Sequence, residues 1–133
     1  HTLDAELPDL RERLKALGGL DVGLDTVGGA LWEALFRAAR PEGRLLPLGF
    51  ASGDVPQIKA NHLLVKNLAV IGFNLGAYRR IAPQALAESA GQVMDWLVAG
   101  RLSLQIGARF PFEAAEDARA VAGKIVVVVD PAL

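Results

Sequence analysis

The sequence contains no cysteine and only two histidines, His1 and His62. The absence of cysteine excludes disulfide bonds, thiolate catalysis and a structural zinc held by thiolates, and it makes an intracellular, cytoplasmic location the default. The two histidines lie far apart, and neither belongs to an H-E-x-x-H pattern. We therefore expect no bound metal and interpret His62 as a loop or surface residue.

The chain also lacks an excess of charge and a long apolar run. Its 14 basic and 15 acidic residues leave a net charge of -1 without a block of either sign, which argues against nucleic acid and acidic lipid as partners. The longest apolar stretches, residues 63–73 and 125–129, are far shorter than the ~20 apolar residues of a membrane span. We expect no membrane-spanning segment.

The length of 133 residues predicts one domain and leaves no room for a cofactor domain and a substrate domain together. The sequence begins at His1 without a Met or a signal peptide, so we expect a fragment of a larger protein. A hydrophobic content of 52% is enough to bury a core.

Segments with helical and strand-like patterns alternate along the chain. Apolar residues at helical spacing, with Asp9 and Arg13 placed for an ion pair one turn apart, predict helical segments over residues 8–17, 30–40, 61–66, 83–100 and about 112–122. Short apolar runs predict strands over residues 20–27, 44–49, 67–73, 105–109 and 124–129. This alternation predicts an α/β fold with a parallel sheet, and a ligand site outside the carboxyl ends of the strands.

Three glycine-containing loops follow the first three predicted strands, at residues 26–29, 49–53 and 72–76. Glycine lets backbone amides approach a ligand closely, so these loops could line the nicotinamide side of a crevice. On spacing alone, ordinary tight turns are the favoured interpretation of these loops. No G-x-G-x-x-G motif is present, so the phosphate-binding half of a dinucleotide site is missing.

Other candidate residues have simpler explanations. Ser52 lies outside a G-x-S-x-G motif and is interpreted as a turn former. Asp21 and Asp25 flank a predicted strand, where hydrogen bonding at the strand end is favoured over acid/base catalysis. Residues 78–80, Tyr-Arg-Arg, suit a phosphate or carboxylate partner, although a solvated loop before a helix is favoured.

Several short motifs occur in a characteristic order: LDTVGG at residues 24–29, PEGRL at 41–45, GFASG at 49–53, VIGF at 70–73 and GKIV at 123–126. Over residues 17–130 the chain resembles the C-terminal part of the zinc-type alcohol dehydrogenase-like nucleotide-binding domain in quinone oxidoreductase-like medium-chain dehydrogenases/reductases, the zeta-crystallin branch. The family usually has several more polar residues just before the position of Gly123, so a loop is lost or the tail is shortened here.

The resemblance implies the second half of a Rossmann-type parallel sheet in three layers, with a C-terminal helix and strand that return toward a missing GroES-like domain. Residues 1–133 would then be a partial nucleotide-binding domain with a tail, without the N-terminal substrate domain and the glycine fingerprint. It also implies a homodimer formed through the strand at residues 67–73.

The activity implied by the resemblance is that of a zinc-independent oxidoreductase that uses NADPH, with NADH not excluded, to transfer hydride to a quinone or an α,β-unsaturated carbonyl. The alternatives are an enoyl-thioester reductase and a non-catalytic binding or dimerisation module. The cofactor supplies the chemistry of hydride transfer, so we assign no catalytic residue. We expect the chain alone to be inactive and to bind dinucleotide weakly or not at all.

The resemblance also implies a set of cofactor-binding residues. The first loop would line the ribose and nicotinamide edge, the second would pass the nicotinamide ring, the third would close over it, and a lysine would lie near the cofactor end of the tail. These residues are Thr26, Val27 and Gly28, then Gly49, Phe50, Ala51, Ser52 and Gly53, then Phe73, Asn74 and Leu75, and finally Lys124.

Overall fold

The computed structural model describes residues 1–117 and 124–129. The chain forms two compact units, His1–Ala77 and Tyr78–Leu133. Among the described residues, no helix is both long and apolar enough to cross a membrane.

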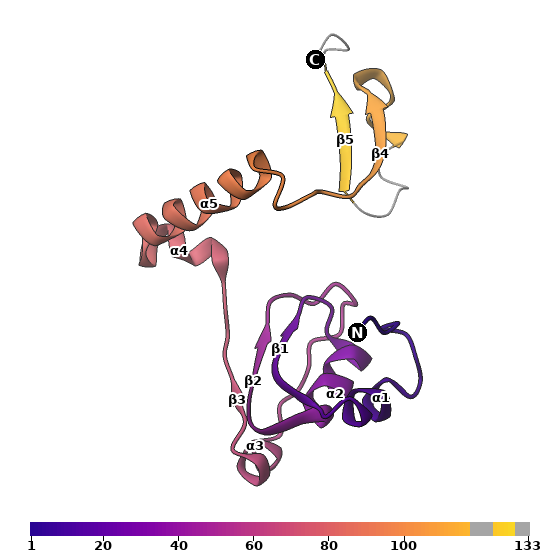
Figure 1. Ribbon diagram of the computed structural model, residues 1–133, viewed down its shortest axis with the longest axis vertical. Coiled ribbons are helices and arrows are strands. Elements are labelled where there is room, and N and C mark those ends of the chain that lie inside the picture. The colour runs from indigo at the N-terminus through magenta and orange to yellow at the C-terminus, as the bar shows by residue number, and fades with distance from the viewer. Residues whose placement is uncertain (118–123, 130–133) are drawn as a thin grey trace. The chain divides into compact units, whose positions relative to one another are not determined.

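The first unit contains a parallel sheet with the strand order β1-β2-β3. Helix α2 packs against β1 and β2, and α1 packs against α2 (Figure 1). The predicted alternation and the parallel sheet are confirmed. The strands are β1 (Leu20–Asp25), β2 (Ala39–Pro47) and β3 (Ala69–Val70), and the helices are α1 (Leu10–Ala16), α2 (Gly29–Ala38) and α3 (Ala60–Lys66).

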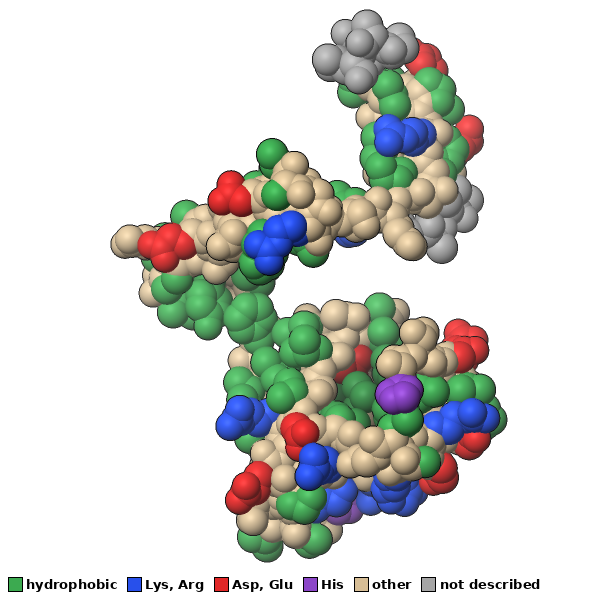
Figure 2. Space-filling view, viewed as in Figure 1, with side chains coloured by type: hydrophobic (Ala, Val, Ile, Leu, Met, Phe, Trp, Pro, Cys, Tyr) green, Lys and Arg blue, Asp and Glu red, His purple; other side chains and the backbone are tan. Residues whose placement is uncertain are grey.

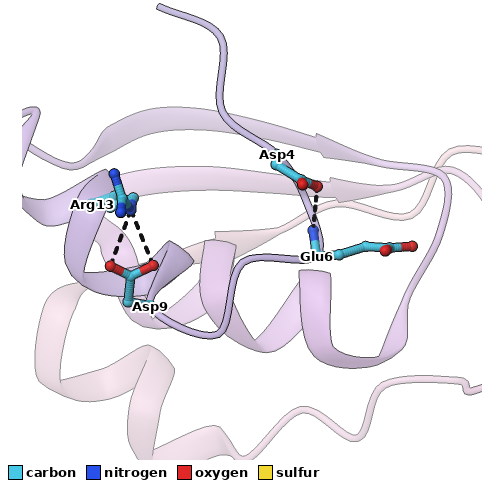
Figure 3. Close-up of polar contacts among 4 residues, drawn as sticks. All are labelled: Asp4, Glu6, Asp9 and Arg13. Carbon is cyan, nitrogen blue, oxygen red and sulfur yellow. Dashed lines mark hydrogen bonds and ion pairs between the residues drawn. The ribbon is translucent and has the colours of Figure 1, made fainter.

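Helix α1 carries the expected ion pair on its first turns. Both carboxylate oxygens of Asp9 accept from Nε of Arg13 at 3.0 Å (Figure 3). In the segment before the helix, the carboxylate of Asp4 accepts from the backbone N–H of Glu6 at 2.9 Å (Figure 3). Both contacts are exposed, so they contribute little to stability.

The residues between α2 and the regular part of β2 differ from prediction. The sequence predicts a helix as far as residue 40, but α2 already ends at Ala38 and β2 begins at the next residue. In the register, Leu20 pairs with Ala39 and Val22 pairs with Arg44. One residue of β1 therefore faces a four-residue bulge in β2, which Glu42 supports with a φ of +66°.

A small apolar core holds the first unit together. Trp32 and Phe36 of α2 stack with ring centroids 6.0 Å apart. They are buried in one cluster with Ala39 and Leu45 of β2 and with Leu68, which precedes β3. Trp32 is therefore a packing residue.

Strand β3 has two residues, whereas the sequence predicts a strand over 67–73. Asn67 adopts a left-handed conformation with φ +52° at the end of α3, and the N–H of Leu68 donates to the carbonyl of Leu63. Residues 67 and 68 therefore form the C-terminal cap of α3, and the strand begins only after them. After Val70, the N–H of Ile71 still donates to Leu45 at 2.9 Å.

The described part of the second unit contains α4 (Tyr78–Ile81), α5 (Pro83–Val98), β4 (Ile106–Pro111), the 3₁₀ helix η2 (Phe112–Ala114) and β5 (Lys124–Val128), with β4 and β5 parallel. Helix α5 begins with Pro83, as predicted, and Gly100 follows it with φ +68°. Apolar side chains on its surface are visible in Figure 2.

Two local predictions in the second unit need correction. Residues 78–81 form a short helix where a loop was favoured. Residues 112–117 contain the 3₁₀ helix η2 in place of the first part of an α-helix. The remainder of that predicted helix, residues 118–122, lies outside the described residues.

Candidate functional site: two interlocked loops at the carboxyl edge of the sheet

The carboxylate of Asp25 closes the turn between β1 and α2. The side chain is 2% exposed. Its Oδ1 accepts from the N–H of Val27 at 2.8 Å and of Gly28 at 3.1 Å, and its Oδ2 accepts from Gly28 at 3.0 Å. Asp21 is exposed and pairs with Arg40 at 3.2 Å. The two aspartates therefore do not form a catalytic pair, and the predicted hydrogen bonding at the strand end is confirmed for Asp25.

The loop that follows β2 is hydrogen-bonded along its length to this turn. The N–H of Leu48 donates to the carbonyl of Asp25, and the N–H of Ala51 donates to Thr26 at 3.1 Å. The N–H of Ser52 donates to the carbonyl of Val27 at 2.9 Å. These bonds bring together the first two predicted groups of site residues, Thr26 to Gly28 and Gly49 to Gly53.

The side chain of Ser52 strengthens the same connection. Its hydroxyl donates to the carbonyl of Val27 at 2.7 Å and accepts from the N–H of Asp54 at 3.2 Å. The carbonyl of Asp54 in turn accepts from the N–H of Gly29 at 3.2 Å. Ser52 is thus a turn-forming residue, as predicted, with its hydroxyl engaged by the backbone. Asp54 was missed, because its contact with a residue 25 positions earlier leaves no local pattern.

Two glycines lie where the two loops approach each other most closely. Gly28 has φ +78° and ψ -159°, a region essentially restricted to glycine. A Cβ at this position would lie 2.5 Å from the carbonyl oxygen of Asp54, and a Cβ at Gly49 would lie 3.2 Å from the carbonyl oxygen of Thr26. The glycines therefore allow backbone to pack directly on backbone.

The third predicted group follows β3 on the same edge of the sheet, because parallel strands end on one side. Asn74 accepts through Oδ1 from the N–H of Ala77 at 3.2 Å and closes the 3₁₀ helix η1 (Leu75–Ala77). The side chain of Phe73 is 38% exposed and that of Leu75 is 57% exposed. This loop is therefore held by its own turn.

Lys124 does not belong to the same unit as the three loops. It is the first residue of β5, where it is exposed and pairs with Ile106. Its proposed position near the cofactor stays a prediction.

Over the described ranges, 1–117 and 124–129, no group of three or more His, Cys, Asp or Glu side chains is placed to hold a metal ion. His62 lies on helix α3 and is half-buried, rather than in a loop. Its ring is 5.9 Å from the ring of Phe36, and its Nε2 is 3.4 Å from Nη1 of Arg37.

The edge formed by the first two loops is mainly backbone. The N–H groups at the start of α2, those of Val27, Gly28 and Gly29, already donate to Asp25 and Asp54. Free N–H groups at a helix N-terminus attract phosphate, but these three N–H groups are taken by the chain's own carboxylate and carbonyl. The arrangement therefore suits an uncharged, planar part of a ligand better than a phosphate.

Comparisons with known proteins define the class. Residues 1–91 match the model of the zinc-binding dehydrogenase family, and the chain belongs to this family. It is 32% identical over 136 residues to a quinone oxidoreductase-like protein 2 homolog of Nematostella vectensis, covering 95% of this chain and 37% of the relative. It is 33% identical over 106 residues to quinone oxidoreductase-like protein 2 of Bos taurus, covering 80% of this chain and 30% of the relative. The chain thus spans about a third of the length of these curated relatives.

Solved structures agree with this assignment. The quinone oxidoreductase of Thermus thermophilus, also determined in complex with NADPH, is 35% identical, with a TM-score of 0.71 over 91% of this chain and 40% of that one. The Escherichia coli quinone oxidoreductase complexed with NADPH is 22% identical, covers 95% of this chain and 42% of that one, and shows the shared fold with a TM-score of 0.76. The predicted resemblance and the Rossmann-type α/β class are confirmed.

Proposed function

We propose that this chain is the nicotinamide-side part of the cofactor domain in an oxidoreductase that uses NADPH or NADH, without catalytic zinc, to reduce a quinone or an α,β-unsaturated carbonyl. One observation carries the proposal: the loops after β1 and β2 are joined to each other by hydrogen bonds. They lie at the carboxyl edge of a parallel sheet, where such folds bind their ligands. The family assignment and the quinone oxidoreductase names of the relatives support it.

In this proposal the three loops hold the nicotinamide and its ribose. Bound NADPH or NADH supplies the hydride, and the residues of this chain orient the ring and exclude water. The backbone of residues 49–53 lies against the turn after β1, and the half-exposed ring of Phe50 provides an apolar border. The residues proposed to contact the cofactor are Thr26, Val27, Gly28, Gly49, Phe50, Ala51, Ser52, Gly53, Phe73, Asn74, Leu75 and, from the tail, Lys124.

The N–H groups of Val27, Gly28 and Gly29 already donate to acceptors of the chain itself. The proposal therefore predicts that binding at this edge depends on the nicotinamide part of a ligand and not on its phosphate groups. We expect reduced nicotinamide mononucleotide and NADPH to bind the 133-residue chain with similar, weak affinity and to shift the same amide resonances in residues 26–29 and 49–53. Adenosine 2′,5′-bisphosphate, which carries phosphate groups but no nicotinamide, is the matched control ligand. Equal or tighter binding of this control at the same resonances would contradict the proposal.

The substrate is tested in the longer protein that contains this chain. Oxidation of NADPH and of NADH is followed at 340 nm with a quinone, an enone and an enoyl-thioester as acceptors. Turnover of the quinone or enone supports the proposal, and turnover of the enoyl-thioester alone identifies the alternative reductase. A folded protein that binds NADPH but reduces none of these acceptors would be a binding or dimerisation module.

We also propose that two copies of the chain pair through the open edge of β3. Ile71 donates to Leu45 from the side facing β2, so the N–H of Val70 faces the free edge. Val70→Pro is expected to lower the dimer fraction in sedimentation velocity without removing a bond of the sheet. Ile71→Pro is the control, because it removes the hydrogen bond from Ile71 to Leu45 within the sheet. A Val70→Pro variant that dimerises as well as the unaltered chain would contradict this interface. The cytoplasmic location stays a prediction from the sequence.

A further inference from the structure

A small cavity lies at the carboxyl end of α2, away from the glycine turn at its amino end. Its volume is about 160 Å³, and its walls are formed by Phe36, Arg37, His62, Val65, Lys66 and Leu68. Helix α2 has 10 residues and rises ~1.5 Å per residue, so its two ends are roughly 15 Å apart. Pockets for drug-sized ligands begin at about 300 Å³, so this cavity suits one small chemical group.

Three of the six residues that line the cavity carry side-chain nitrogen groups, and none of the six is Asp or Glu. These three are Arg37, His62 and Lys66, and the other three lining residues are apolar. The nearest described carboxylate partner of Arg37 is Glu33, whose oxygen is 3.6 Å from Nε. Nη1 of the same guanidinium points instead to His62, at 3.4 Å. Basic side chains and a histidine are visible together on the lower part of this unit in Figure 2.

The ammonium group of Lys66 is held in place by backbone. Its Nζ donates to the carbonyl of Arg37 at 3.0 Å and to the carbonyl of Ala39 at 2.8 Å. A lysine ammonium has three donors, so one is left for a ligand. Burial is the main cause that lowers the pKa of Lys66, and the positive charges of Lys15, Arg11 and Arg37 lower it further. A bound anion would relieve this repulsion.

We propose that the cavity binds a phosphate group, either as inorganic phosphate or as the head of a small phosphomonoester. Arg37 and Lys66 approach the cavity from α2 and α3 as obligate donors, and His62 adds a third nitrogen one helical turn before Lys66. A tetrahedral oxyanion can accept from donors that converge from different elements, and arginine is well suited to it. Phe36 and Leu68 provide an apolar surface for the organic part of a phosphomonoester.

The test is a titration of the ¹⁵N-labelled 133-residue chain with inorganic phosphate and with phenyl phosphate at constant ionic strength, with chloride as the control anion. We expect saturable shifts of the His62 and Lys66 resonances with millimolar affinity. Arg37→Gln and His62→Gln are each expected to weaken binding at least fivefold. Arg13→Gln makes the same charge change in an ion pair that does not line the cavity, and it should bind like the unaltered chain.

The outcomes separate the two phosphate sources and the two sites. Tighter binding of phenyl phosphate indicates a phosphomonoester, and equal or weaker binding indicates free phosphate. Either result supports the cavity as a phosphate site. Shifts that chloride reproduces, or affinities that Arg37→Gln and His62→Gln leave unchanged while thermal melts show folded protein, would overturn it. The nicotinamide titration is independent, because its reporting resonances lie at the other end of α2.

Discussion

Both oxygens of the Asp25 carboxylate accept from the single backbone N–H of Gly28, at 3.1 and 3.0 Å. The carboxylate is thereby fixed at the first turn of α2, where a negative charge is favourable. This one side chain joins the end of β1 to the start of α2. It also sets the conformation of the turn on which the loop after β2 is packed.

Asp25→Ala is expected to lower the free energy of unfolding by about 1–3 kcal/mol, because the N–H groups of Val27 and Gly28 lose a buried charged acceptor. Chemical denaturation followed by circular dichroism measures the loss. Asp21→Ala is the control: its exposed pair with Arg40 should be worth less than about 1 kcal/mol. Equal effects of the two substitutions would contradict the role given to Asp25.

Gly28→Ala and Gly53→Ala form a second matched pair. Both glycines have similar positive φ angles, +78° and +80°, so both substitutions carry backbone strain, and the ψ of -159° at Gly28 adds to it there. At Gly53 the new methyl group meets nothing within 4 Å, whereas at Gly28 it would lie 2.5 Å from the carbonyl of Asp54. Gly28→Ala is therefore expected to be the more destabilising by at least about 2 kcal/mol. Similar unfolding midpoints would show that the two loops do not pack as described.

Leu45→Ala tests the core of the first unit. Leu45 is fully buried between α2 and the neighbouring strands, so its truncation is expected to cost about 2–5 kcal/mol. Leu64 on α3 is 79% exposed, and Leu64→Ala should change stability by less than about 0.5 kcal/mol. Urea denaturation of the two variants gives the comparison, and a loss at Leu64 as large as that at Leu45 would refute this core.

The lowered pKa of Lys66 predicts a pH dependence of stability. Burial, followed by Lys15, Arg11 and Arg37, lowers this pKa from 10.5. The folded chain thus loses the proton of Lys66 before the unfolded chain does, and the unfolded state binds more protons in the window just below pH 10.5. The contribution of Lys66 to the free energy of unfolding should therefore rise as the pH rises toward 10.5.

This contribution is isolated by comparing the unaltered chain with Lys66→Met in urea denaturation at neutral pH and near pH 10. The stability difference between the two proteins should shift in favour of the unaltered chain at the higher pH. Lys59→Met, at an exposed position just before α3, is the control and should show no such shift. A difference that stays constant with pH would contradict the predicted linkage.

The sequence predicted the elements whose signals are local. Apolar spacing and the glycine pair at 28–29 located β1 and α2, and Pro83 located the start of α5. Tertiary contacts decided the rest. Ala39 joins a strand because Leu20 lies beside it, although the Pro-Glu-Gly stretch that follows is typical of a helix end.

The candidate site was predicted as three glycine-containing loops, and the structure joins the first two by hydrogen bonds. What the sequence could not indicate is which groups make those bonds. Ser52 and Val27 are 25 positions apart, so no local periodicity relates them. The phosphate cavity was missed for a similar reason, because Arg37 and Lys66 come from different helices and meet only after folding.

The bonds between the turn after β1 and the loop after β2 also bear on the energetics of ligand binding. The backbone of both segments is held by the chain's own hydrogen bonds, so its conformational entropy is lost when the chain folds. A planar ring that enters here meets a preorganised surface and does not have to organise a mobile loop. Association at this edge should therefore be fast and should follow a single exponential. Differences in affinity among related ligands should come mainly from their dissociation rates.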